Sequence, residues 1–396
     1  MSSGAAGLRI VRLANFVMPR SGGLRTALRC LGAGYAANGH QPVLIVPGER
    51  YSDETTAEQG RVITLPGPMV PMTGGYRVLL GRRPLAKLLD RLAPDRLEVS
   101  DRTTLRWTGR WAREAGVPSI MVSHESLAGL LRLSGLSGAA GRRVADGLNA
   151  RSAASYDTIV CTTGWAADEF ERIDTPNLVR APLGVDLTTF HPSRHDPAAR
   201  DRYAKPDEVL LVTCTRLSPE KKPELAVDAL AALRRAGVPA HLVVLGDGPR
   251  RPMLEERAAK LVTGRSASPV TFAGFLPDQV AVATLLASAD VVIAPGPVET
   301  FGLAALEALA CGTPVVVNAA SALPEVIGDA GTAAAGNGAE LAEAVLRLLA
   351  LDPGLRRSRA RARAEVFSWP AAAAGFLRAH NAAVTAGRAR ADVEAA

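Results

Sequence analysis

The sequence predicts an α/β protein with two domains, each built around a doubly wound parallel sheet. The chain has 396 residues, which is too long for one ordinary core and suits two domains. Short apolar runs alternate with longer segments of helical periodicity, a pattern that produces right-handed βαβ units. The alternation stops once, at the polar, proline-containing segment Thr188–Glu208, and then resumes. This segment is interpreted as the inter-domain connection.

The elements of the first domain follow from the alternation in chain order. The expected strands are 8–17, 42–48, 96–100, 119–125, 158–163 and 178–186. The expected helices are 25–39, 84–93, 105–116 and 164–172, with a further helical region before residue 158. Short β-rich runs separated by helical segments are typical of a parallel sheet.

The second domain repeats the pattern. Its expected strands are 209–217, 241–249, 270–275, 290–296 and 313–318, and its expected helices are 223–237, 253–261, 280–289, a helix from about Gly302 and a last helix over 339–351. The predicted domains are residues 1–190 and 191–366, with a C-terminal helix at about 367–390 that could cross back onto the first domain. Two such domains facing one another leave a cleft at the carboxyl ends of both sheets, where ligands are expected.

Composition narrows the class of protein. The net charge is +7 and aromatic residues make up 4% of the chain; because no nucleic-acid-binding module is visible, nucleic acid is not an expected partner. The four cysteines form no CxxC pair, which favours buried thiols over disulfides or a zinc site. No signal peptide and no run of about 18 apolar residues is visible. The expected location is therefore cytoplasmic, with the inner membrane face as an option.

Two arginine-rich stretches, 77–96 and 355–366, allow two interpretations. They are either solvated helix faces or a surface for an anionic partner such as lipid head groups. In 77–96 the basic residues are interleaved with leucines, which is the basis for a hypothesis of peripheral binding to an anionic membrane or to a polyanionic acceptor, beside the plainer interpretation as solvated helix faces.

The stretch PGPVETFGLAALEALACGTP, residues 295–314, places one glutamate in a loop and another inside an apolar helix. The helix begins near Gly302, and its unpaired N–H groups suit a phosphate. Helical side chains lean toward the N-terminus, so Glu307 leans back toward that site. Glu299 lies in the preceding loop. Because carboxylates repel phosphate, the two acids suit the hydroxyls of a ribose and a hexose; alternatively, Glu299 caps the helix and Glu307 is half-exposed.

A second constellation, VTCTRLSPEKKPE (residues 212–224), follows a strand and precedes a helix. Arg216 and Lys221 lie five residues apart in this loop. A planar guanidinium and a compact ammonium together suit a diphosphate, whereas a solvated turn is the plainer alternative. The turn LGDGP at 245–249 is a weaker signal of the same kind.

In the first domain, Gly22 and Gly23 precede a helix, and His124 ends a strand in the sequence SHES. The glycines suit either a tight turn or a phosphate approach, and they do not spell GxGxxG, which argues against a dinucleotide-dependent oxidoreductase. A histidine at a strand end faces the expected cleft, although a lone histidine is often structural. No metal-binding motif is present, so no metal is expected.

Together these residues resemble the retaining glycosyltransferase family 4. ETFGLAALEALACGTPVV resembles that family's E-x7-E signature, and TRLSPEKKPE, LGDGP, FAGF and LGVDLTTFHP resemble its other landmarks in the same order. The first domain resembles it more loosely, through SGGL and SHES. Two departures are Leu183, where the family often has Asn, and Thr300, where it often has Gly. The segment 97–127 is similar to actinobacterial mannosyltransferase-like members.

The resemblance implies a GT-B fold, with an acceptor-side first domain and a nucleotide-sugar-binding second domain. It implies that Glu299 contacts the donor sugar, Glu307 the ribose, and Arg216 and Lys221 the diphosphate. The remaining implied site residues are the backbone at Phe301, Gly302 and Leu303 at the phosphate and sugar, the segment near Phe275 at the base, Gly22 and Gly23 at the phosphates, and His124 near the sugar.

The function expected is therefore a retaining, metal-independent glycosyltransferase without a cofactor. It moves a hexose, with mannose as one candidate, from a GDP- or UDP-linked donor to a hydroxyl of a glycan, glycolipid or small molecule. Two alternatives are a sugar-nucleotide epimerase or phosphorylase on the same fold, and a protein that binds the nucleotide sugar without catalysis.

Overall fold

The computed structural model describes residues 7–17, 22–70, 75–133, 135–136, 138–262 and 267–395, apart from the side chains of Leu133 and 388–395. The chain divides into two compact units. The first unit comprises Met1–Leu183 and Trp369–Ala396, and the second comprises Gly184–Ser368. The division therefore falls at 183/184, seven residues before the boundary expected from the sequence.

The first unit contains an eight-stranded sheet with the order β3-β4-β2-β1-β5-β6-β7-β8. The strands are β1 (Arg9–Ala14), β2 (Gln41–Gly48), β3 (Ser52–Thr56), β4 (Gly60–Pro66), β5 (Arg96–Ser100), β6 (Ser119–Ser123), β7 (Thr158–Cys161) and β8 (Leu178–Arg180). All neighbours pair in parallel except β3, which pairs antiparallel with β4. The sequence analysis missed β3 and β4. The missed β3 reads SDETT and is mostly exposed, so it lacks the apolar signal of a buried strand.

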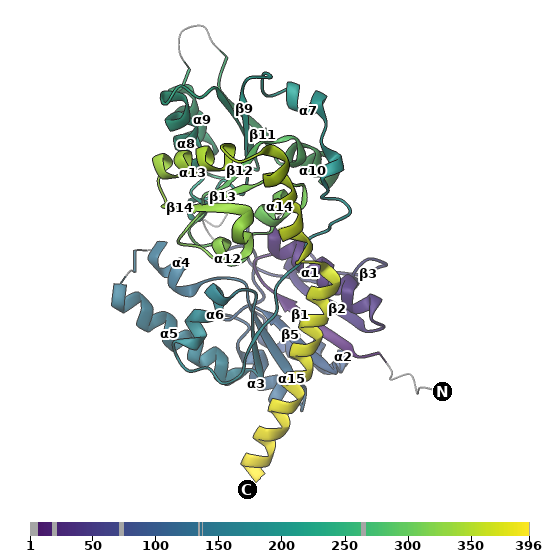
Figure 1. The fold of residues 1–396 in the computed structure, drawn as a ribbon. Helices are drawn as coiled ribbons and strands as arrows, with labels where there is room; N and C mark the ends of the chain where they lie inside the picture. Colours follow the sequence, from purple (N-terminus) through teal and green to yellow (C-terminus); the bar gives the residue numbers. More distant parts are fainter. Residues whose placement is uncertain are drawn as a thin grey trace. The chain divides into compact units, whose positions relative to one another are not determined.

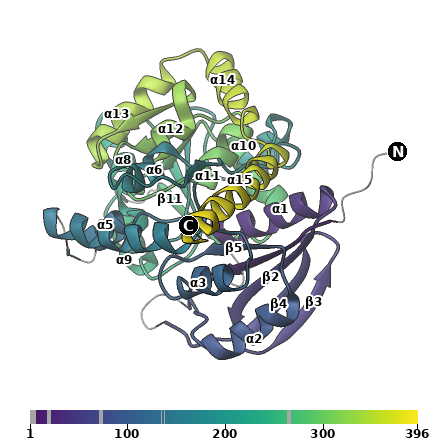
Figure 2. The ribbon, with the colours of Figure 1, turned by 90° about the horizontal axis from the view of Figure 1, so that it is seen from below.

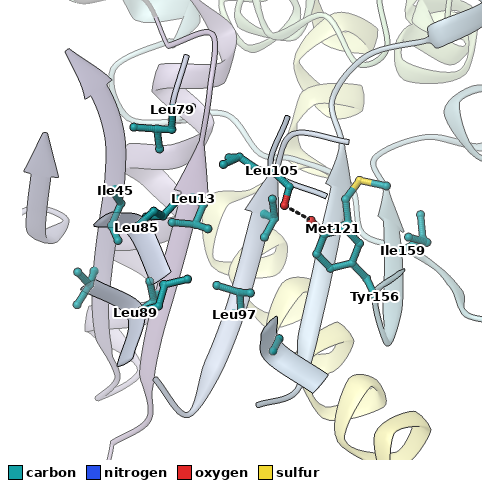
Figure 3. Packing of buried hydrophobic residues seen from close by; sticks show 14 of the residues in the cluster. Leu13, Ile45, Leu79, Leu85, Leu89, Leu97, Leu105, Met121, Tyr156 and Ile159 are labelled. Atoms are coloured by element: carbon teal, nitrogen blue, oxygen red, sulfur yellow. Dashed lines mark hydrogen bonds between the residues drawn. The ribbon is translucent and has the colours of Figure 1, made fainter. Parts of the chain in front are cut away.

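Helices cover both faces of this sheet (Figure 2). They are α1 (Gly23–Ala37), α2 (Arg82–Leu92), α3 (Trp107–Glu114), α4 (Leu127–Leu133), α5 (Gly138–Ser155), α6 (Gly164–Glu171) and α15 (Trp369–Ala395). Helices α1 and α15 lie side by side on one face, and α2 and α3 lie on the other (Figure 2). The core on the α2 side combines leucines of α2 with alternate strand residues (Figure 3), and Tyr156 closes it by donating a hydrogen bond to the Leu105 carbonyl over 3.1 Å.

The second unit contains a six-stranded parallel sheet with the order β11-β10-β9-β12-β13-β14. The strands are β9 (Val209–Cys214), β10 (Ala240–Leu245), β11 (Val270–Gly274), β12 (Val291–Ala294), β13 (Val315–Asn318) and β14 (Gly331–Ala334). The helices are α7 (Pro197–Asp201), α8 (Glu224–Arg235), α9 (Arg251–Ala259), α10 (Gln279–Ser288), α11 (Leu303–Ala310), α12 (Leu323–Ile327), α13 (Gly338–Leu349) and α14 (Pro353–Glu365). Helices α8, α9 and α13 bury their apolar residues against one face of the sheet (Figure 1). The sequence analysis missed β14, whose four residues GTAA carry little β-signal.

The predicted connection at 188–208 is not a free linker. Phe190 and Ala199 are buried. The backbone N–H of Asp196 donates to Ser288 Oγ over 3.0 Å, and Arg200 pairs with Asp290 at 2.9 Å. The prediction was wrong because polar side chains here pack by hydrogen bonds and ion pairs, which leave no apolar period in the sequence.

The arginine-rich stretch 355–366 forms α14, and its arginines have internal partners. Arg357, Arg361 and Arg363 each donate to carbonyls in the last turn of another helix. The carbonyls belong to Ala287 in α10, Ala310 in α11 and Val326 in α12. Because helix C-termini carry unpaired carbonyls and partial negative charge, these arginines act as caps. The interpretation of this stretch as an anion-binding surface was wrong for these three residues.

Candidate active site

The strand order of the second unit identifies where a ligand should bind. Taken in chain order from β9 to β14, the sheet has the 3-2-1-4-5-6 arrangement of a doubly wound fold. The order reverses between β9 and β12, which are neighbours through the pair Val292 and Val212. In such sheets ligands bind outside the carboxyl ends of the strands at this switch point. The loops that follow β9 and β12 contain Arg216, Lys221, Glu299 and Gly302.

Lys221 and Glu299 meet at the switch point, although 78 residues separate them in sequence. Lys221 Nζ donates to Glu299 Oε1 over 2.6 Å, and both side chains are about one-fifth exposed. A Cβ at Gly296 would lie 3.5 Å from the Lys221 Cα, so the two loops are in close contact. The pair therefore holds a cation and a carboxylate together, partly shielded from water.

Arg216 has a local carboxylate partner that the sequence analysis did not consider. Arg216 Nη2 donates to Glu220 Oε1 over 2.7 Å, and Ser218 Oγ donates to the same oxygen over 2.5 Å. Lys222 adopts a left-handed backbone conformation with φ of 48°. Non-glycine residues with positive φ are uncommon overall, and those that exist are concentrated in functional loops. The loop after β9 is thus a fixed turn that carries two cations.

Two glycines hold the loop after β10 against the loop after β9. A Cβ at Gly246, where φ is +120°, would lie 2.0 Å from the Thr215 carbonyl oxygen, and one at Gly248 would lie 2.5 Å from the Leu217 oxygen. Only glycine fits these backbone approaches. The Gly246 N–H also donates to the Gly274 carbonyl over 2.8 Å, which places exposed Phe275 beside the same row of loops.

The N-terminus of α11 lies at the same edge of the sheet, after the loop that contains Glu299. Gly302 has φ of +78°, and a Cβ there would lie 2.2 Å from a Leu323 methyl carbon. Phe301 and Leu303 are buried, so only the backbone at these two positions is available to a ligand. Asn318, which the sequence analysis missed, donates from Nδ2 to the Pro295 carbonyl over 2.9 Å and positions the loop. A lone Asn at the end of β13 gave no signal of this role.

Glu307 lies in the second turn of α11 and is half-buried. Its carboxyl makes no hydrogen bond or ion pair with any residue that the structure describes. Burial raises the pKa of Glu307 to about 8. Burial, followed by the charge of Glu307, raises the pKa of the Cys214 thiol to about 12, which places the acid beside the end of β9. A buried acid without a partner is a group that a ligand can satisfy.

In the first unit, His124 follows β6 and its Nε2 lies 3.1 Å from Ser100 Oγ at the end of β5. Burial lowers the pKa of His124 to about 4, so the imidazole is neutral at physiological pH. Gly22 and Gly23 begin α1, and a Cβ at Gly22 would meet no atom within 4 Å. These three residues lie at the carboxyl edge of the first sheet, whereas the other predicted site residues belong to the second unit.

The first unit also contains two buried polar clusters that the sequence analysis missed. In one, the Glu98 carboxylate accepts from Arg12 Nε over 2.8 Å and from the Tyr35 hydroxyl over 2.6 Å, and it lies 3.3 Å from His380 Nε2 in α15. The attraction of Arg12 and these hydrogen bonds outweigh burial and hold the pKa of Glu98 far below its usual range. The other cluster is built around Glu169. Charged residues in the middle of apolar patterns give little sequence signal of this pairing.

No group of three or more His, Cys, Asp or Glu side chains among the described residues is arranged to hold a metal ion. Within the same residues, no helix is both long and apolar enough to cross a membrane.

Comparisons with known proteins agree with this architecture. Residues 196–365 match the model described as glycosyl transferases group 1, and residues 22–184 match a glycosyl transferase 4-like domain. A GDP-mannose-dependent alpha-(1-6)-phosphatidylinositol dimannoside mannosyltransferase of Mycobacterium tuberculosis (strain H37Ra) is 52% identical over 375 residues, covering 93% of this chain and 95% of that protein. A D-inositol 3-phosphate glycosyltransferase of Actinosynnema mirum is 35% identical over 249 residues, 58% of each protein. The solved sucrose-phosphate synthase of Thermosynechococcus elongatus has a TM-score of 0.74 at 20% identity, covering 94% of this chain and 98% of that one.

Two Rossmann-like units with these matches define a glycosyltransferase of the GT-B fold, an enzyme that moves a hexose from a nucleotide sugar. The chain belongs to glycosyltransferase family 4. The resemblance stated from the sequence, the fold class and the enzyme class are thereby confirmed.

Proposed function

We propose that this protein transfers mannose from GDP-mannose to a hydroxyl of a mannosylated phosphatidylinositol. The observation that carries the proposal is the 52% identity to a mannosyltransferase of that description over 93% of the chain, which includes both units. The second unit would bind the donor and the first unit the acceptor.

The donor contacts are proposed from the second unit. Lys221 and Arg216 bind the diphosphate together with the N–H groups at the start of α11, because charge-assisted bonds and a helix N-terminus both stabilise phosphate oxygens. Glu307 accepts hydrogen bonds from the ribose hydroxyls. Its missing hydrogen-bond partners among the described residues support this role. Glu299 binds hydroxyls of the mannose, and the segment near Phe275 contacts the base.

The ion pair between Lys221 and Glu299, at 2.6 Å, holds both side chains in position before the donor binds. When the diphosphate arrives, Lys221 gains phosphate oxygens as acceptors and Glu299 is left to accept from sugar hydroxyls. Groups that are already oriented need little reorganisation when charge develops in the transition state. The pair would thus favour departure of the diphosphate.

The reaction would retain the anomeric configuration and need no metal. The bond between the sugar C1 and the donor phosphate oxygen breaks, and the acceptor oxygen bonds to C1 on the same face. The acceptor proton passes to the leaving phosphate oxygen, so no general base from the protein is required, and the same-face attack requires no nucleophilic residue. Arg216, Lys221 and the helix N–H groups supply the positive charge that a metal ion would otherwise provide.

A thermal-shift comparison tests the donor. GDP-mannose should raise the melting temperature more than UDP-glucose or ADP-glucose at equal concentration, because a ligand of the folded state stabilises it by mass action. Transfer to phosphatidylinositol mannosides in mixed micelles should follow, undiminished by EDTA, and NMR of the product should show an α-linked mannose. No shift with GDP-mannose, combined with a shift by another donor, would refute the donor assignment.

Incubation with GDP-mannose alone separates the alternatives. An epimerase would produce a new sugar nucleotide without any acceptor, and a phosphorylase would release mannose 1-phosphate and GDP once inorganic phosphate is added. A non-catalytic protein would bind the donor without turnover on any acceptor. A transferase should show only slow hydrolysis until the lipid acceptor is added.

A second candidate acceptor is a soluble inositol phosphate. It is favoured by the similarity to D-inositol 3-phosphate glycosyltransferases at 33–35% identity, which spans 53–60% of this chain. Turnover with inositol phosphate that exceeds turnover with the mannosylated lipid would select this candidate.

We further propose that α2 contacts an anionic membrane surface. Its basic side chains are exposed and have no ion pair among the described residues: Arg82, Arg83, Lys87 and Arg91. The leucines interleaved with them are buried in the core, so the association would be electrostatic and would weaken with salt. Co-sedimentation with anionic vesicles should fall between 50 and 300 mM NaCl; the absence of binding at low salt would contradict it.

A further inference from the structure

A cavity of about 220 Å³ lies within the first unit between α4, α5 and α6. These three helices lie together in Figure 1, and Ser126, at the start of α4, lies two residues after His124. The volume is below the range of about 300–1,000 Å³ typical of whole small-molecule sites. It therefore suits one polar group of a larger ligand. We name it the α4–α6 pocket.

The inner wall of the pocket is already satisfied. Glu169 accepts from Ser126 Oγ over 2.5 Å, from the Ala128 N–H over 3.0 Å and from Asn149 Nδ2 over 3.1 Å. Arg102, also buried, lies 3.5 Å from the same carboxylate and balances its charge. This wall thus has a fixed shape and presents no uncompensated negative charge to a ligand.

The outer wall carries an excess of positive charge. Arg132 on α4 and Arg142 on α5 line the pocket, are exposed, and form no hydrogen bond or ion pair with any described residue. Arg172 on α6 also lines it but is paired with Asp146. Two guanidinium groups from different helices at one opening are suited to an anion such as a phosphodiester.

Two further groups indicate a ligand with both hydroxyls and a ring. Asp168 lines the pocket and is exposed, and its carboxylate accepts no hydrogen bond within the described part of the chain, so the carboxylate can accept from ligand hydroxyls. Trp165 is half-buried and packs against the core cluster, which leaves a rigid aromatic wall beside the cavity. Aromatic walls with a few polar groups are typical of small-molecule sites.

The pocket also has one exposed apolar side chain in its lining. Leu136, between α4 and α5, lines the pocket and is exposed. A large apolar residue on a surface that also carries arginines is suited to an amphiphile, whose chains lie on the apolar residue while its head enters the polar cavity.

Resting on the proposed function, we propose that the α4–α6 pocket binds the anionic, hydroxyl-rich head of the acceptor lipid. Arg132 and Arg142 bind its phosphodiester, Asp168 accepts from its ring hydroxyls, and Leu136 contacts the first part of its acyl chains. The pocket thereby determines which acceptor is used, and it is separate from the donor contacts of the second unit.

A charge-matched pair of double variants tests this assignment. Arg132→Ala/Arg142→Ala removes both pocket cations, whereas Arg143→Ala/Arg151→Ala removes two exposed cations of α5 that do not line the pocket. The pocket variant should raise the acceptor KM by about tenfold or more, the equivalent of roughly 1.4 kcal/mol. Its donor KM and its melting shift with GDP-mannose should stay unchanged. Equal acceptor KM values in the two double variants would overturn the proposal.

Vesicle binding distinguishes the sources of the anion. Wild-type protein should co-sediment more with vesicles containing phosphatidylinositol than with vesicles of equal charge containing phosphatidylglycerol, and this preference should disappear in the pocket variant. Asp168→Asn should reduce the preference without reducing total binding. The melting temperature should rise with myo-inositol 1-phosphate and should rise less with inorganic phosphate at equal concentration, because only the first has a ring with hydroxyls. Equal shifts with the two compounds would contradict recognition of the ring.

These outcomes separate the two proposals. A failure of GDP-mannose to bind would refute the proposed donor, while the vesicle preference would still report on the pocket. Normal transfer with identical acceptor KM values in both double variants would leave the glycosyltransferase function intact and refute the pocket assignment.

Discussion

The two units share one strand order but differ in how their switch points are built. In the first unit, disregarding the hairpin strand β3, the order from β4 to β8 reverses between β1 and β5, just as the second unit reverses between β9 and β12. In the first unit, Asn15 after β1 donates to Asp101 after β5 over 2.6 Å, so two neutral or acidic side chains meet there. In the second unit, Lys221 meets Glu299 and glycines fix the loops. Under the proposed roles, the same topology would serve an anion in the second unit and a different ligand in the first.

The buried charges of the first unit should give the largest effect. Glu98→Gln leaves the Arg12 guanidinium buried without its counter-charge, which should lower the free energy of unfolding by about 3–5 kcal/mol. All four tryptophans, at 107, 111, 165 and 369, belong to this unit, so urea unfolding followed by tryptophan emission reports on it. Arg12→Met/Glu98→Leu should recover most of the loss. If Glu98→Gln is as stable as the wild type, the buried charges of the first unit do not have the structural role given to them here.

The pH dependence of the free energy of unfolding follows from the Glu98 carboxyl. The pKa of Glu98 is lower in the folded state than in the unfolded state, so its contribution is present above the unfolded pKa of about 4.3 and is lost as pH falls. The difference in stability between wild type and Glu98→Gln should therefore shrink below pH 4.

In the second unit, Lys221→Ala should lower kcat by about 10²–10³, which corresponds to about 2.7–4 kcal/mol of transition-state stabilisation. The reason is the loss of one charge-assisted contact to the leaving diphosphate. Lys260→Ala is the control and should keep its rate, because Lys260 is an exposed lysine of the same unit that pairs, among the described residues, with Glu256. Tryptophan emission should be unchanged in both. Near wild-type turnover of Lys221→Ala would refute its proposed role.

Gly302→Ala should have a smaller effect, about 2–3 kcal/mol, from a strained positive φ and a close contact with Leu323. Gly237→Ala is the matched control, because Gly237 has φ of +80° but no atom within 4 Å of an added Cβ. The difference between the two variants isolates the contact. This difference should appear in the melting temperature and in the rise of melting temperature that GDP-mannose causes. Equal effects would show that backbone strain alone accounts for Gly302.

Glu307 is tested through pH, where its effect on the free energy of unfolding is at most about 1.4 kcal/mol per pH unit. The pKa of about 8 means that the folded state holds a proton which the unfolded state releases above about pH 4.3. Stability of the wild type should therefore fall from pH 5 to 8 relative to Glu307→Gln. Donor KM should decrease over the same range, since a carboxylate accepts from two hydroxyls. Glu343→Gln on α13 should reproduce neither trend, and a flat donor KM in wild type would contradict the ribose assignment.

The sequence predicted the second unit better than the first for a physical reason. Glycine, proline and the scarce lysines occur where backbone geometry and charge require them, as at Gly246, Gly302 and Lys221, so their positions are informative without a structure. Buried ion pairs lack such a signature: Arg12 and Glu98 look like ordinary strand residues until their partners are known. Asn318 was missed because a single amide at a strand end is consistent with many roles.

Long-range partners explain the other differences. The segment 188–208 was taken as a linker because its packing depends on α10, about 90 residues further on. Strands β3 and β14 were missed because short polar or small-residue strands are formed by their neighbours and not by their own propensity. The leucines of α2 were correctly read as a helical face, but only the structure shows that this face is buried.

The last helix has a consequence for biosynthesis. His380 contacts Glu98 across 282 residues, and α15 covers α1 and part of the first sheet. The second unit, Gly184–Ser368, is translated between the two parts of the first unit. At a translation rate of about 5–20 residues per second, the first unit therefore waits about 10–40 s with an apolar face and the Glu98 carboxylate uncovered. A nonsense mutation after Ser368 would leave that face permanently uncovered. Such a truncated chain should be held by chaperones or degraded, even though the second unit, the proposed donor-binding unit, is intact.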